Sequence, residues 1–371
     1  MLLLGEDFST SYDSATFQSK IKEYGIENVL DAPKNLPTNA LLFLPIAWLP
    51  PLQAKIAWTL FSVLCLYLAL YFLFKSYDIQ FFSPGGMVVC IMILLFKPIY
   101  VNIALGQMYL FLLALFSSAV YCMRANYLTT TGTLISTALL LKGYGAFPFV
   151  FAAFIHRKFK LWVTVFLLPI VFLITLPFFG LNSWQIYYES VFITLGRLPL
   201  DSHVAYQTIN GWVRHLLIVD ETLPTVPNYY FPAWIVEITV GITLLYVVLY
   251  IGYYANRHAK QNIALSFAAC VAASVIIAPL AEEYHYVLFL PLFTGMVSIT
   301  LLKRKTFREL MLTDYLLVLS FLFMAMPLGY TKLQSIEFPV FLLAYPKLYA
   351  GLLMLFLFGH YVRNQTKTYF H

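Results

Sequence analysis

Two adjacent carboxylates and a histidine interrupt a long apolar stretch near residue 282. Glu282, Glu283 and His285 lie in the run Ala278-Pro279-Leu280-Ala281-Glu282-Glu283-Tyr284-His285-Tyr286, between two segments that are each apolar enough to enter a bilayer. Carboxylates and imidazoles can move protons or bind charged ligands. Because charged groups at a membrane boundary are costly unless they face water, a partner or a ligand, this run is a candidate functional site. An ordinary polar loop joining two spans is the alternative interpretation.

Three residues elsewhere in the chain also have side chains suited to a polar ligand. Asp7 could act as a general base, and its structural alternative is a helix N-cap. Gln107 follows Gly106 at a predicted tight turn, where its amide could bind a ligand or satisfy backbone groups. Lys142 closes an apolar run, where a lysine is costly unless it meets an anion or extends to the interface with water.

A fourth group lies in the run Tyr206-Gln207-Thr208-Ile209-Asn210-Gly211-Trp212-Val213-Arg214-His215. Gln207, Asn210 and Arg214 supply the amides and the guanidinium that commonly bind sugar hydroxyls and phosphate. A surface helix with an aromatic anchor at the lipid interface would have the same composition.

The spacing of these residues does not match a known metal site. The run at 282–285 lacks the i, i+4 histidine pair of a metalloprotease helix. The four cysteines all lie inside apolar segments, which favours neither a disulfide framework nor a metal site. We therefore predict no cofactor, with a divalent cation shared by Asp7, Glu282 and Glu283 as the alternative.

The composition indicates what kind of element must position these residues. Of the 371 residues, 61% are apolar or aromatic and 11% are charged, whereas about a quarter are charged in a soluble domain. The basic residues form short clusters between apolar runs, so the net charge of +6 does not indicate nucleic acid. The chain is predicted to be an all-α protein that crosses the lipid bilayer many times.

We expect a single integral membrane domain over residues 1–371 with about eleven membrane segments. Residues 128–155 are interrupted near Lys142 and are predicted to form two short segments. The other predicted crossings are 52–74, 84–101, 107–123, 161–180, 231–255, 263–281, 285–302, 314–329 and 339–362.

Two polar insertions and the two chain ends complete this organisation. Residues 6–51 are predicted to form a first loop that contains an amphipathic interfacial helix, and 181–230 to form a second large loop. Residues 1–5 resemble the end of a span whose beginning is absent. Residues 303–371 are expected to add further spans.

The distribution of lysine and arginine predicts the orientation of the chain. If 6–51 is extracytoplasmic, more than half of the 23 basic residues fall inside, with only Asp78, Glu309 and Asp314 as acidic residues there. The same assignment places all the candidate residues at the outer face: Asp7, Gln107, Lys142, Gln207, Arg214, Glu283 and His285. One constellation of acid, base, amide and cation is therefore predicted outside the cytoplasm.

Six motifs in the order of the chain resemble glycosyltransferase family 87. The resemblance covers about residues 5–290 and implies a bundle of GT-C architecture. The motifs are Gly5-Glu6-Asp7-Phe8, the proline-rich segment 37–51, Gly106-Gln107, the leucine run before Lys142, Gln207-Thr208-Ile209-Asn210-Gly211 with Arg214, and Ala278-Pro279 followed by Glu283 and His285-Tyr286.

The resemblance implies transfer of a hexose, with mannose as the first expectation, from a polyprenyl monophosphate to a glycolipid or glycan acceptor. The transfer would invert the sugar at the outer face of a bacterial plasma membrane, with Asp7 as general base. His285, Lys142 and Arg214 would stabilise the leaving phosphate, and Gln107, Gln207 and Asn210 would orient sugar hydroxyls. Glu283 would bind a substrate or fix the tautomer of His285. In the segment 282–286 the chain departs from the family's Trp-Glu-His-His-Tyr pattern, which leaves the sugar open.

Other classes of protein share some of these features. A lipid-linked glycan ligase, polymerase or flippase would also place cations for lipid phosphate at the outer face. A secondary transporter would have broken helices, but its key polar groups would lie near the middle of the spans. The transferase accounts best for polar groups gathered at one face.

Overall fold

All the regular structure in the part of the chain that the computed structural model describes is helical, with no strand there. This confirms the prediction of an all-α protein. The described residues are 7–23, 35–142, 162–195, 203–217, 233–260, 262–303, 311–333 and 340–368.

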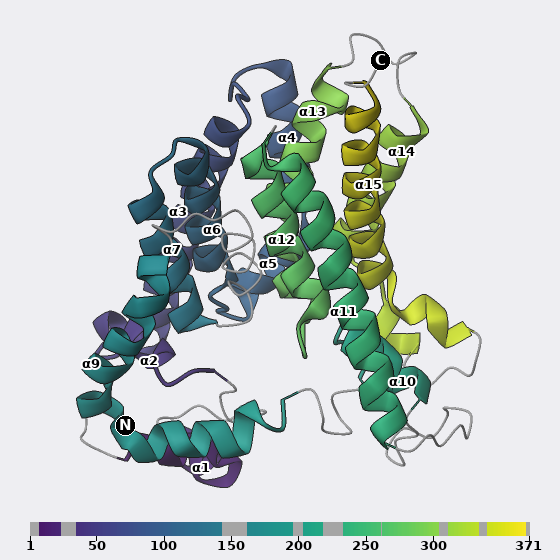
Figure 1. Cartoon of the computed structure of the whole chain (residues 1–371). Helices are drawn as coiled ribbons and strands as arrows, with labels where there is room; N and C mark the ends of the chain where they lie inside the picture. The colour runs from purple at the N-terminus through teal and green to yellow at the C-terminus, as the bar shows by residue number, and fades with distance from the viewer. Residues whose placement is uncertain are drawn as a thin grey trace.

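Figure 1 shows an upright bundle of helices, with η2 and α1 below it near the N-terminus. The α-helices are α1 (Ser14–Glu23), α2 (Asn39–Phe43), α3 (Pro51–Ser76), α4 (Pro84–Leu94), α5 (Lys97–Ala104), α6 (Tyr109–Arg124), α7 (Leu128–Leu141), α9 (Trp162–Tyr187), α10 (Ile209–Leu217), α11 (Ala233–His258), α12 (Ile263–Ile277), α13 (Leu290–Ile299), α14 (Leu312–Ala325) and α15 (Pro346–Thr368). Short 3₁₀ helices are η2 (Phe8–Tyr12), η3 (Leu44–Ile46), η7 (Glu283–Phe289), η8 (Leu301–Lys303), η10 (Tyr330–Leu333) and η11 (Val340–Ala344), and η5 (Tyr188–Phe192) is a π-helix.

Two of these helices are long and apolar enough to cross a membrane alone, namely Pro51–Ser76 and Trp234–His258. The bent pair α4 and α5 would add a third span, and α6, α7, α12 and α14 are shorter apolar helices. Large apolar side chains such as Leu60 and Leu249 are exposed on the two long helices, as expected of a surface that faces lipid. These observations support a membrane protein, and the number of about eleven segments stays a prediction.

The predicted crossing at 84–101 is a bent pair of helices. It forms α4 and α5, which meet at an angle of 48°. Proline at position 98 explains the break, because its ring clashes with the carbonyl of residue 94 and it has no N–H to donate. The break places Lys97 at the first position of α5.

Prolines also explain three other boundaries that differ from the prediction. The crossing predicted at 263–281 ends at Ile277, because the residue before Pro279 disfavours the helical conformation. The crossing predicted at 285–302 begins as the 3₁₀ helix η7, and α13 follows with a proline in its first turn. The crossing predicted at 339–362 is split, since α15 begins only at Pro346.

The polar insertions are described in part. The predicted interfacial helix is present as α1, while its placement at a membrane surface stays a prediction. Positions 24–34, 143–161, 196–202 and 218–232 lie outside the described residues, so parts of the predicted segments 128–155 and 181–230 do as well. The predicted C-terminal region contains α14 and α15.

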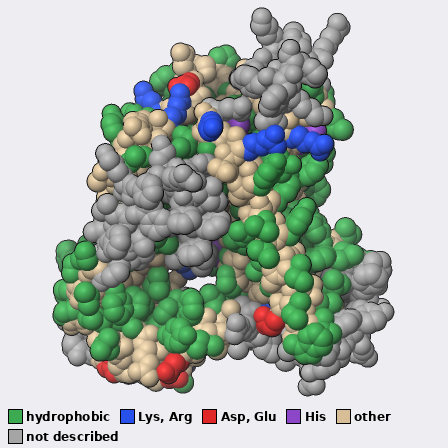
Figure 2. Space-filling model, viewed as in Figure 1, with side chains coloured by type: hydrophobic (Ala, Val, Ile, Leu, Met, Phe, Trp, Pro, Cys, Tyr) green, Lys and Arg blue, Asp and Glu red, His purple; other side chains and the backbone are tan. Residues whose placement is uncertain are grey.

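The two ends of the bundle differ in charge. Arg124, at the end of α6, bonds the Ser76 carbonyl and pairs with Asp78 at 2.5 Å, so α3 and α6 end together. Figure 2 shows lysine and arginine side chains gathered at this upper end. Because α3 and α6 both end there, the start of α6 lies at the lower end of the bundle. The candidate residues are found at that lower end.

Candidate functional site

The segment that follows α12 crosses the lower end of the bundle and is fixed there by residues from distant parts of the chain. The amide N–H of Gln207 donates to the carbonyl of Ala281 at 2.8 Å, and Asn210 Nδ2 donates to the carbonyl of Pro279 at 3.0 Å. The Tyr286 hydroxyl donates in turn to the Gln207 carbonyl at 2.6 Å. The 206–215 and 278–286 motifs therefore form one structural unit.

His285 is buried in this unit, and its ring nitrogens have different roles. The backbone N–H of Glu282 donates to Nδ1 of His285 at 3.0 Å. Because Nδ1 accepts a hydrogen bond there, the imidazole is neutral and its proton is on Nε2. The ring packs on Tyr109 and Tyr284, with centroid separations of 4.1 and 4.5 Å. His285 is thus held as a hydrogen-bond donor at Nε2 rather than as a cation.

Lys142 lies beside the same aromatic ring. It caps the end of α7, and its ammonium is 5.4 Å from the centroid of Tyr109. Burial lowers the pKa of Lys142 to about 8, while the carboxylate of Glu282 opposes this shift. Lys142 and His285 therefore share Tyr109 as a neighbour, so a cation and a neutral donor lie close together.

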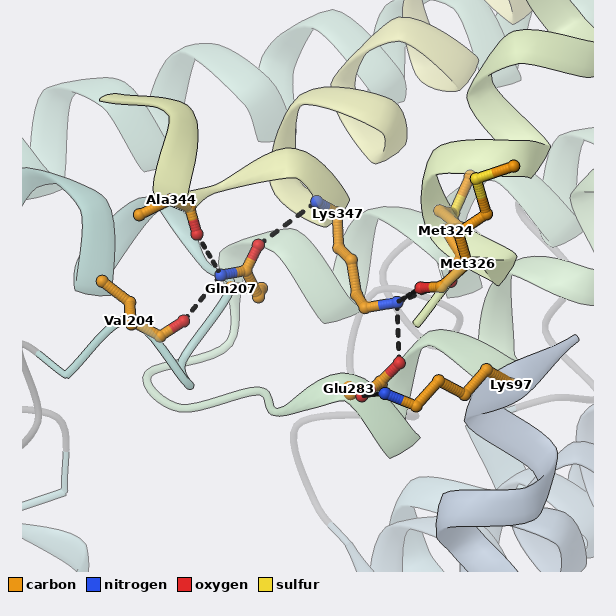
Figure 3. Close-up of polar contacts among 8 residues, drawn as sticks. All are labelled: Lys97, Val204, Gln207, Glu283, Met324, Met326, Ala344 and Lys347. Carbon is orange, nitrogen blue, oxygen red and sulfur yellow. Dashed lines mark hydrogen bonds and ion pairs between the residues drawn. The ribbon is translucent and has the colours of Figure 1, made fainter. Parts of the chain in front are cut away.

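Glu283 pairs with two lysines that sequence analysis did not select. Its carboxylate oxygens lie 3.1 Å from Lys97 Nζ and 2.8 Å from Lys347 Nζ, as Figure 3 shows. Both lysines lie in or beside apolar runs, which is the signal that singled out Lys142. Applied uniformly, that criterion would have selected them too. The tautomer of His285 is fixed by Glu282, and the Glu283 side chain serves these ion pairs.

The amides and the guanidinium of the 206–215 motif are engaged with the protein. Gln207 Nε2 donates to the carbonyls of Val204 and Ala344, at 2.6 and 2.8 Å, and its Oε1 accepts from the backbone of Lys347 (Figure 3). Arg214 is buried, donates to Asn210 Oδ1 at 2.9 Å, and pairs with Glu237 at 2.5 Å. These contacts connect the 206–215 motif to neighbouring parts of the chain and so stabilise the structure of the site. The binding of sugar or phosphate by these residues stays a prediction.

Gln107 lies at the same end of the bundle. Gly106 has φ +63°, a conformation that favours glycine, and it turns the chain from α5 into α6. The backbone N–H of Gln107 donates to the Asn102 carbonyl at 2.9 Å. Asn102 Nδ2 donates to the Tyr284 carbonyl at 3.0 Å, which joins this turn to the His285 segment.

Asp7 lies on a separate unit of the structure. It is exposed and caps η2, accepting the Ser9 N–H at 2.9 Å on Oδ1. Hydrogen bonds from the backbone and side chain of Ser9 lower the pKa of Asp7 below its usual range. The helix it caps packs on α9, where the rings of Phe8 and Phe179 are 5.2 Å apart.

Two contacts connect this N-terminal unit to the lower end of the bundle. The Tyr12 hydroxyl donates to the Asn35 carbonyl at 2.9 Å, and the Thr38 hydroxyl bonds the carbonyl of Leu140, two residues before Lys142. Figure 2 shows an opening between the lower part of the molecule and the bundle. Asp7 and Lys142 thus lie toward the same end of the molecule, on different units.

Within the described part of the chain, no group of three or more His, Cys, Asp or Glu side chains could hold a metal ion. The predicted residues fall into two sets. Lys142, Glu283 and His285 lie together in or around η7, framed by Gln107, Gln207, Asn210 and Arg214, whereas Asp7 lies on the N-terminal unit.

Comparison with known proteins gives one match. A family model described as glycosyltransferase family 87 matches residues 36–279. Searches of curated proteins and of solved structures found no match. The matched range contains the Gln107, Lys142, Gln207, Asn210 and Arg214 positions.

Proposed function

The chain belongs to glycosyltransferase family 87, and from this premise we propose that it transfers a hexose from a polyprenyl monophosphate carrier to a glycolipid or glycan acceptor. Mannose is the first candidate for the hexose. Membership of the family makes the protein a membrane glycosyltransferase. The donor, the acceptor and the roles of individual residues are our proposal.

The cluster of Lys142 and His285 around Tyr109 is the observation that supports this proposal most directly. A positive charge and a neutral N–H donor, both partly or fully withdrawn from water, suit an anionic leaving group. Such preorganised groups stabilise charge as it develops, and removing one typically costs about 10²- to 10³-fold in rate.

In the proposed reaction, a hydroxyl oxygen of the acceptor attacks C1 of the donor sugar from the side opposite the phosphate. The bond between C1 and the phosphate oxygen breaks, and its electron pair leaves with the phosphate. Asp7 accepts the hydroxyl proton, while His285 Nε2–H and Lys142 donate to the leaving phosphate. The sugar is therefore inverted at C1.

The orientation belongs to the proposal as well. Lys75, Arg124 and Arg257 lie at the ends of α3, α6 and α11, opposite the end that carries the cluster. The positive-inside rule then supports an extracytoplasmic site in a plasma membrane, with residues 1–371 as one integral membrane domain.

A transfer assay with purified protein in lipid nanodiscs tests this function. The donors are polyprenyl-phosphate mannose labelled in the sugar and, in parallel, a diphosphate-linked oligosaccharide; cell-envelope lipids serve as acceptors. We expect label to move from the monophosphate donor to a glycolipid with inverted anomeric configuration. Transfer only from the diphosphate donor would instead identify a ligase or polymerase.

A further inference from the structure

A row of three charged side chains lies beside the residues assigned to the reaction. The row runs from Lys347 through Glu283 to Lys97, and it joins the starts of α15, η7 and α5 (Figure 3). The exposed fraction of the side chains rises along it, from 0% for Lys347 to 12% for Glu283 and 34% for Lys97. The row therefore leads from the protein interior to an accessible cation.

Lys347 is fully occupied by the protein. Its ammonium donates to the carbonyls of Met324 and Met326, at 2.7 and 3.4 Å, and pairs with Glu283 at 2.8 Å. An ammonium has three donors, so Lys347 has none left for a ligand. Its contacts tie the end of α14 and the start of α15 to Glu283.

Lys97 is the accessible end of the row. Its contact with Glu283 uses one of its three donors, and a third of its side chain is exposed. The element that carries it is docked on the His285 segment at a second point, because Asn102 of α5 donates to the Tyr284 carbonyl. Lys97 thus has both the donors and the fixed position that binding an anion requires.

Among the described residues, the charges around η7 do not cancel. Three lysines and two glutamates contact one another or lie close together there, which leaves one positive charge in excess: Lys97, Lys142 and Lys347 against Glu282 and Glu283. An uncompensated charge in surroundings of low dielectric constant is costly, and an anionic ligand removes that cost.

We infer that Lys97 is a further binding residue for the phosphate of the lipid-linked donor, and that Glu283 and Lys347 are positioning residues that hold it in place. This inference rests on the proposed function and adds residues from α5 and α15 to its donor site. Lys97 provides charge-assisted hydrogen bonds to phosphate oxygens, and Glu283 limits the positions that the flexible lysine side chain can adopt.

The first test measures binding of farnesyl phosphate, a short analogue of the polyprenyl phosphate that leaves in the proposed reaction, to purified protein in detergent. We expect Lys97→Gln to weaken binding by about 10- to 100-fold, since a hydrogen bond to a charged group contributes that much. Lys97→Arg should retain most of the affinity. Farnesol, which lacks the phosphate, should bind all three proteins alike. Lys75→Gln, at the opposite end of the bundle, is the matched control and should bind farnesyl phosphate as the wild type does.

The positioning role is tested by a double substitution that keeps the net charge. Replacing Glu283 by Gln and Lys347 by Met together removes one charge of each sign, and the ion that loses its partner is Lys97, whose side chain is 34% exposed. We expect this protein to fold and to bind farnesyl phosphate several-fold more weakly, with a higher KM for the donor. If it folds and binds the probe as the wild type does, Glu283 and Lys347 have a structural role only.

A measurement on the wild-type protein needs no substitution at Lys97. Amine acetylation followed by mass spectrometry should modify Lys97, and farnesyl phosphate, unlike farnesol, should protect it. Lys75 should react equally in every sample. A Lys97 that does not react, or that reacts equally with and without the probe, would overturn the inference.

These outcomes separate the two proposals. If wild-type protein neither binds farnesyl phosphate nor transfers from a polyprenyl monophosphate, both the proposed function and the inference are wrong. If wild-type protein binds and transfers, but Lys97→Gln binds the probe equally well, only the role of Lys97 is wrong.

Discussion

The N-terminal unit that carries Asp7 and the segment around η7 are built in opposite ways. The two carboxylates of the N-terminal unit accept local bonds, Asp7 from Ser9 and Asp13 from Thr16, and both are exposed. Around η7 the bonds join distant parts of the chain, as in the contact of Glu283 with Lys347. The comparison indicates that the proposed phosphate site is preorganised by the whole bundle, whereas the proposed base is carried by a small separate unit.

This difference affects how each region responds to substitution. Removing one partner of a buried ion pair leaves a charge without compensation, so changes around η7 affect stability as well as activity. An exposed carboxylate with local bonds can be changed with little effect on folding. The following predictions test the comparison, beginning with the largest expected effect.

Asp7→Asn should lower kcat by about 10²- to 10⁴-fold, the usual contribution of a general base. Asparagine can still cap η2, so the thermal unfolding temperature should stay near that of the wild type. Asp13→Asn is the matched control, because Asp13 is an exposed capping carboxylate on the same unit. It should retain activity. Full transfer by the Asp7→Asn protein would remove Asp7 from the role of base.

His285 allows its two ring nitrogens to be tested separately. In His285→Asn the side-chain oxygen can still accept the Glu282 N–H, but the donor at the Nε2 position is lost. We expect transfer to fall by about 10²- to 10³-fold, as for other preorganised donors. His285→Gln keeps an N–H near the Nε2 position and should retain more activity. Equal loss in both variants would show that the Nε2 donor is not what matters.

The lowered pKa of Lys142 predicts a pH dependence with a definite sign. Lysine is charged below its pKa, so kcat/KM for the donor should decline as pH rises through about 8. For a single group with this pKa, kcat/KM should fall by about tenfold between pH 7 and pH 9. The phosphodiester of the donor keeps its charge over this range. Lys142→Arg should move the decline to higher pH, since arginine stays charged. An unchanged profile in that variant would assign the decline to another group.

The smallest effect is expected at the Arg214–Glu237 pair. Glu237 is 45% exposed on its side chain, and the glutamine oxygen can still accept from the buried Arg214, so Glu237→Gln should lower stability by only about 0.5–1 kcal/mol. The KM for the donor should be unchanged if Arg214 only supports the structure of the site through its hydrogen bond to Asn210. A clear fall in donor KM in this variant would show instead that a released Arg214 binds phosphate.

Sequence patterns predicted the helical class and the membrane location, and they singled out the charged 278–286 segment, whose function stays a prediction. They did so because the cost of placing charge next to apolar runs depends on local composition. The partners of those charges depend on packing between distant segments, which explains why Lys97 and Lys347 were not assigned to Glu283. The sequence pattern also could not show that the backbone N–H of Glu282 bonds Nδ1 of His285 and keeps the ring neutral. That contact forms only because residues 283–289 fold into the 3₁₀ helix η7.

The amides illustrate the same limit. Gln207 and Asn210 have side chains typical of sugar binding, but in the structure they bond the carbonyls of Val204, Ala344 and Pro279. A side chain's chemistry indicates what it can bind, and the competition among neighbouring backbone groups decides what it does bind in the folded chain.

α12 is buried on all sides, with every residue from Ala264 to Ile276 shielded. A helix that is apolar and enclosed around its whole circumference lies at the axis of a bundle rather than at its rim. The segment proposed to be catalytic continues from the end of this axis, so under our proposal a lipid-linked sugar enters with its head first. The long hydrocarbon tail would stay among the lipids outside, and selectivity would concern the head group and the first isoprene units much more than the total chain length.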